Sequence, residues 1–163
     1  MSGQALLYGG MAGLQLAGGY FAAQNIREAA AINKEIADMN AEFAELDAYD
    51  AEIAGISQVA QYQTVIDQVE SEQNAIFAAQ NVDASVGSAA AVVEESKFIS
   101  ELNKMEIEKQ AEEVALGYNR QANDFRRSGV LGVAKGMQQA GDVMFNSAMQ
   151  AANTGLTGYR RSR

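Results

Sequence analysis

No proline occurs anywhere in the 163 residues of this chain. Proline makes up about 5% of an average sequence, and it interrupts a helix because it has no amide hydrogen and clashes with the preceding turn. Its absence favours long, unbroken helices. The sequence therefore predicts an all-α fold: a long helical hairpin with Gly/Ala-rich apolar helices at both ends, assembling into a homo-oligomeric ring or tube.

The chain also lacks histidine, cysteine and tryptophan. Histidine and cysteine supply the usual general base, the thiol nucleophile and the commonest ligands of transition metals. A Ser–His–Asp or Cys–His catalytic site is therefore excluded. The sequence contains no P-loop, no dinucleotide-binding fingerprint and no EF-hand loop. We expect a protein that is not an enzyme, with no catalytic residues, no metal site and no cofactor.

Alanine dominates the apolar content of the chain. Hydrophobic residues make up 48% of the sequence, but 30 of them are alanines. An alanine seam lets helices approach closely, yet it buries little area at about 25 cal/mol per Å². We therefore expect a marginally stable monomer that gains stability in an oligomer.

Charge is unevenly distributed along the chain, whose net charge is −9. Residues 1–26 carry no charge, residues 35–83 contain 11 acids and no base, and residues 118–163 contain seven bases and two acids. This order of neutral, acidic and basic segments suits a protein whose parts lie in different environments better than it suits a compact enzyme. The acidic stretch is expected either to be simply solvated or to repel DNA along an aqueous channel.

Composition divides the chain into six segments. We expect an apolar, glycine-rich membrane or packing helix over 1–26 and a long acidic helix over 27–80. A turn over 81–88 and a return helix over 89–127 follow. The last two segments are a Gly/Ala/Met amphipathic helix over 128–158 and a basic tail over 159–163.

Small residues recur at every fourth position near the start of the chain. The ladder consists of Ala5, Gly9, Gly13 and Ala17, and Phe21 follows it. Such a ladder lets two helix backbones approach closely, especially in membranes. Two interpretations stay open: contact with a membrane at some stage, or permanent burial within protein.

Large apolar residues in the two middle segments follow helical spacing. The spacing predicts coiled-coil-like seams that are interrupted by shifts of phase. In the first long helix the seam would begin with Ile36, Met39, Phe43 and Leu46, and in the return helix with Phe98, Leu102 and Met105. We expect these seams to meet when the return helix folds back.

Four polar or flexible residues interrupt the helical pattern together, and they predict an interhelical turn: Asp83, Ser85, Gly87 and Ser88. Asp and Ser side chains bond the local backbone and compete with helix, and glycine tolerates a positive φ. Ser88 is expected to be the N-cap of the next helix. No chemistry is assigned to this turn.

The last segment holds a second pair of packing glycines, Gly132 and Gly136. Lys135 and Asp142 would be costly at the middle of a bilayer, so the segment is expected to be amphipathic and to seek a partner. The tail ends in three arginines that can bind the phosphates of DNA or of anionic lipid, or simply aid solubility: Arg160, Arg161 and Arg163.

Two stretches of the chain resemble a known family. "AAQNVDASVGSAAAVVEE", followed about 20 residues later by "ALGYNRQANDFRRSG", is similar to sequence in the internal virion proteins of short-tailed bacteriophages. These are also called core or ejection proteins, and the likeness is to the smaller, membrane-conduit type. The family's turn matches Asp83, Ser85, Gly87 and Ser88, and its later run matches Tyr118, Arg120, Gln121 and Ala122.

The resemblance implies a protein stored in the virion interior near the portal and expelled at infection. It would then form part of a channel across the host cell envelope, in the outer membrane or periplasm, through which the genome is delivered. The implied partners are further copies of the chain, other virion core proteins and the portal, host membrane lipid, and DNA through non-specific contacts.

Two other functions remain open from the sequence. The chain could be a purely structural virion or scaffold protein, associated with a portal or core and never entering a membrane. It could also be a membrane-active secretion translocator. Partitioning of residues 1–26 into lipid would distinguish an ejection protein from a purely structural virion protein. Presence in a virus particle would distinguish both of them from a secretion translocator.

Overall fold

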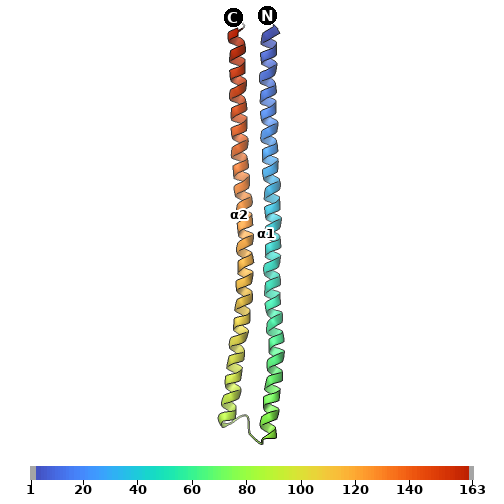
Figure 1. Ribbon diagram of the computed structural model, residues 1–163, viewed down its shortest axis with the longest axis vertical. Coiled ribbons are helices and arrows are strands. Elements are labelled where there is room, and N and C mark those ends of the chain that lie inside the picture. The colour runs from blue at the N-terminus through green and yellow to red at the C-terminus, as the bar shows by residue number, and fades with distance from the viewer. Residues whose placement is uncertain (1–2, 162–163) are drawn as a thin grey trace. The chain divides into compact units, whose positions relative to one another are not determined.

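Two helices contain nearly all of the chain in a computed structural model (Figure 1), which describes the backbone of residues 3–161 and the side chains of residues 10–157 and 160. Helix α1 spans Gly3–Ala79 and helix α2 spans Gly87–Arg161. The described residues include no strand. The expected all-α class with two long helices is confirmed.

The helices contribute to two compact units. The first unit pairs α1 as far as Ala41 with α2 from Asn123 onward. The second unit, Glu42–Ala122, contains the turn and is a helical hairpin by itself. Neither α1 nor α2 is interrupted, so the changes of composition near residues 26 and 127 fall inside continuous helices.

The turn between the helices begins one residue earlier and ends two residues earlier than the sequence predicted. Residues 80–86 connect α1 to α2, and α2 begins at Gly87. Ser88 therefore lies in the first turn of α2 and does not precede the helix as the expected N-cap. Gly87 has a φ of 65°, a backbone conformation that glycine adopts without steric cost, and this lets the chain enter the helix at that residue.

Alanine and glycine form the contact between the helices in the second unit. The buried apolar residues there are Ala44, Ala48, Ile66, Ala89, Ala115 and Ala122. Gly55 faces Ala111 so closely that a side chain at Gly55 would clash with the Ala111 methyl group. Apart from Ile66, the large apolar side chains of this unit lie outside the buried contact.

The first unit is packed in the same way. Its buried apolar residues are Ala23, Ala30, Ala41, Ala140 and Ala151. A Cβ atom added at Gly136 would lie 2.5 Å from the Cβ of Ala30, and one added at Gly129 would lie 3.0 Å from the Cβ of Ala37. The helix–helix contact therefore depends on residues that are almost without side chains.

The seams predicted from large apolar residues are wrong where each of them begins. Ile36, Met39, Phe43 and Leu46 are 45–64% exposed, and Phe98, Leu102 and Met105 are 47–62% exposed. Leu46 lies two residues after the buried Ala44, and two residues turn an α-helix by about 200°. The large side chains therefore lie on the face of each helix opposite the alanine seam.

Replacing Gly136 by alanine tests the close approach in the first unit. We expect Gly136→Ala to lower the free energy of unfolding by about 1–3 kcal/mol, because the new methyl group overlaps Ala30 and forces the helices apart. Gly141, where an added Cβ has nothing within 4 Å, is the matched control. Gly141→Ala should instead stabilise the helix by up to about 1 kcal/mol. Equal effects in chemical denaturation would contradict the assigned contact.

Candidate interaction surfaces

Some predicted site residues lie outside the described side chains. Ala5 and Gly9 belong to α1 by their backbone, but their surroundings are not described. Arg161 ends α2, and Arg163 lies beyond the described residues. Arg160 is exposed. The basic tail is thus represented by this one described side chain.

The small-residue ladder does not face α2 where it is described. Gly13, Ala17 and Phe21 are all exposed, and an added Cβ at Gly13 would have nothing within 4 Å. Gly19, two residues after Ala17, is the residue that approaches α2, against Ser147. The described part of the ladder is therefore a surface open to a partner.

Large apolar side chains surround the ladder on α1. Leu14 is 75% exposed and Phe21 is 64% exposed, and the rings of Tyr20 and Phe21 meet edge to face with centroids 6.2 Å apart. Over the part of the chain that the structure describes, neither helix has a stretch that is long and apolar enough to cross a membrane.

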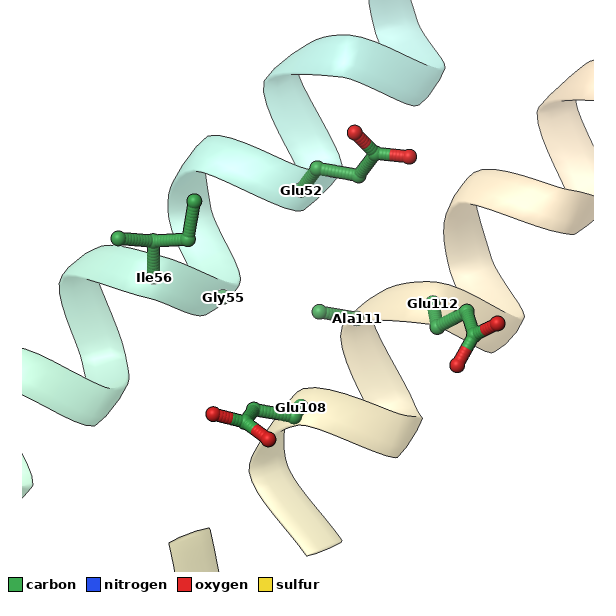
Figure 2. Close-up of a pocket in the computed structure, with 6 residues that line it drawn as sticks. All are labelled: Glu52, Gly55, Ile56, Glu108, Ala111 and Glu112. Carbon is green, nitrogen blue, oxygen red and sulfur yellow. The ribbon is translucent and has the colours of Figure 1, made fainter. Parts of the chain in front are cut away.

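The second unit has an acidic hollow where the helices are closest (Figure 2). Figure 2 shows the Ala111 methyl group pointing at Gly55, while the side chain of Ile56 points away from α2. Three carboxylates line the hollow: Glu52, Glu108 and Glu112. No nucleophile or base accompanies them, and the described residues contain no group of side chains that could hold a metal ion. The hollow is a negatively charged surface that can repel anions.

A basic surface lies on α2 in the first unit. Arg127 lines a hollow together with Val130 and Leu131, and it lines an adjoining hollow with Gly132 and Lys135. An added Cβ at Gly132 would have nothing within 4 Å, unlike one at Gly136. Sequence reasoning paired these two glycines, but only Gly136 packs within the unit. Gly136 lies at one of the positions where small residues repeat along the buried seam, whereas Gly132 does not. This repeat is the sequence feature that distinguishes the two glycines.

Two ion pairs of the described residues join side chains within a single helix. Lys34 pairs with Asp38 and Lys109 pairs with Glu113, each across one helical turn. Such exposed pairs contribute about 0–1 kcal/mol each. Among the residues described, no ion pair joins Lys97 or Lys104 to an acid of α1. Polar contacts between the helices of the second unit include the amide of Asn103, which donates to the Tyr62 hydroxyl over 2.7 Å.

Asp83 organises the interhelical turn. Its Oδ1 accepts a hydrogen bond from the Ser85 hydroxyl over 2.6 Å and another from the Ser85 backbone amide over 2.9 Å. Both bonds favour the charged carboxylate and lower the pKa of Asp83 below its ordinary value of 3.8. Asn81 in this turn also has a positive φ, 53°, which asparagine tolerates better than most residues. The predicted turn residues therefore serve the reversal of the chain.

No family model, curated protein or solved structure matches this chain.

The turn gives a pH-dependent prediction. Because the folded-state pKa of Asp83 is lowered, the charged carboxylate stabilises the turn above pH 3.8, and this stability is lost as pH falls through the lower folded value. We expect Asp83→Asn to unfold more easily than the unaltered chain at pH 7. The difference should shrink as pH drops below 3.8. Urea unfolding followed by circular dichroism across this range measures it.

Ser85→Ala is the control, since it removes the hydroxyl donor but leaves the backbone amide in place. The pKa of Asp83 should then move up toward its ordinary value, which carboxyl chemical shifts in an NMR titration report. A pKa of Asp83 that is unchanged by Ser85→Ala would contradict the assigned hydrogen bond.

Proposed function

We propose that this chain is an internal virion protein of a short-tailed bacteriophage, expelled at infection to form part of a channel that delivers the genome across the host envelope. It acts as a homo-oligomer of helical hairpins rather than as an enzyme. The family resemblance of its turn and return helix supports the proposal, and so does the distribution of its apolar side chains.

The observation that carries the proposal is the outward position of the large apolar residues. Alanines fill the contact between the helices, while more than half of the surface of Leu14, Phe43 and Ile56 is exposed. A monomer that exposes this much apolar surface is poorly suited to remain alone in water. Further copies, other core proteins or lipid must cover it.

A protein that is stored in the virion and acts in the host envelope would need such an exposed apolar surface. In the virion, neighbouring protein covers the apolar side chains. After ejection the same side chains become available to other copies and, at the N-terminal end of α1, to the membrane interface. The long acidic run of α1 would line the aqueous path and repel the passing DNA.

The first test is binding to vesicles that contain anionic lipid, followed by flotation and dye release. The variant Leu14→Glu/Phe21→Glu places charge on exposed apolar positions of α1. We expect its bound fraction to fall at least tenfold, because burial of each side chain in the interface contributes about 1.5–3 kcal/mol. The control Asn25→Glu/Asn33→Glu adds the same charge at exposed polar positions and should bind like the unaltered chain.

The outcomes separate the candidate functions. If the unaltered chain does not bind vesicles, the chain is better described as a structural virion or scaffold protein that does not enter membranes. If it binds vesicles but is absent from purified virus particles by mass spectrometry, a secretion translocator is the better description.

A further inference from the structure

An acidic apolar face lies on the outward side of α1 in the second unit. Residues 42–79 contain eight acids and no base. Phe43, Leu46 and Ile53 are 46–64% exposed. Glutamates directly precede the first two, in the pairs Glu42–Phe43 and Glu45–Leu46, and the exposed Asp50 lies three residues before Ile53. One residue turns the helix by about 100°, so the glutamates flank the apolar stripe. We call this surface the acidic face.

A second outward surface has the opposite charge. On α2 in the first unit, Val130 and Leu131 are 58% and 59% exposed. Arg127 borders both of them in one hollow, and it lines an adjoining hollow together with Lys135 and one acid, Asp124. Gly132 adds no side chain to the hollow beside Leu131, and a Cβ placed there would meet nothing within 4 Å. We call this surface, Arg127–Lys135, the basic face.

We propose that the acidic face of one copy binds the basic face of a second copy of this chain, so that neighbouring copies join α1 to α2. This inference rests on the homo-oligomer of the proposed function and specifies its contacts. The two faces have complementary charge and similar apolar character. The apolar side chains supply affinity on burial, and the flanking charges select the partner face.

Pairing of like faces is disfavoured by the same charges. Two acidic faces together would bring rows of glutamates against each other with no base between them. Like charges placed opposite each other in an interface cost several kcal/mol. A second copy of the chain presents a base-rich surface that matches the acidic face, and this partner is present at the same concentration as the chain itself.

The contact joins two different surfaces, so it is heterologous. Each copy that joins through one face still presents the other, and growth continues until the assembly closes on itself as a ring or extends as a filament. A ring built in this way needs no second kind of subunit.

Charge reversal on each face tests the contact. One variant carries Glu42→Lys/Asp50→Lys, and the other carries Arg127→Glu/Lys135→Glu. We expect each to assemble at least tenfold more weakly than the unaltered full-length chain in sedimentation velocity, because like charges then meet across the contact. An equimolar mixture should regain assembly, because the two intact faces are complementary to each other and so are the two reversed faces. All four substitutions in one chain should restore assembly, because the charges are again complementary.

A matched control reverses two exposed acids elsewhere, Glu101→Lys/Glu106→Lys, and should leave assembly unchanged. Circular dichroism checks that every variant remains helical. The inference is overturned if the acid-reversed variant assembles as the unaltered chain does, or if the four-substitution chain is no better than either parent. A chain that is monomeric at all concentrations would instead overturn the oligomer of the proposed function itself.

Discussion

The close approach of the two helix backbones is the constraint on which the rest of the structure depends. Gly55 lies against Ala111 in one unit, and Gly136 lies against Ala30 in the other. At such a separation glycine and alanine fill most of the contact, so most larger apolar side chains are displaced to another face, and Ile66 is an exception. The seam gains van der Waals contact but buries little area, because alanine has little area to bury. The two helices are thus in close contact, but this contact contributes little hydrophobic free energy.

Each helix consequently carries two stripes with the same period. Seam residues such as Ala44 and Ala48 face the partner helix, and residues two positions later, such as Leu46, face outward. This arrangement gives a helix neighbours on two opposite sides. Hairpins made of such helices are suited to pack side by side in a ring or layer. The alanine seam would join the two helices within one copy, and the outer stripes would join neighbouring copies.

The sequence was sufficient for the all-α class and for the position of the turn to within one or two residues. The absence of proline and the cluster around Asp83 carried those two predictions. Periodicity could not assign the seam, because both stripes repeat every three to four residues and the larger side chains of Met39 and Phe43 have the stronger apolar signal. What decides between them is how closely the backbones can approach, which depends on glycines such as Gly55 and Gly136 meeting small residues across the contact. That match between two distant segments has no local signature.

Charge favours one choice of which helix packs on which between copies, a choice that apolar packing alone leaves open. The stripes of α1 and α2 are both hydrophobic, so area alone would permit α1 to pack on α1, α2 on α2, or one on the other. Eight acids and no base on α1 between residues 42 and 79 make the first arrangement costly, whereas bases such as Arg127 and Lys135 on α2 make the mixed arrangement favourable. The mixed order repeats the alternation of α1 and α2 that already exists within each unit. In the proposed assembly the same sequence of helices would repeat all the way around, and its surplus of acids would face water along the aqueous path proposed to repel DNA.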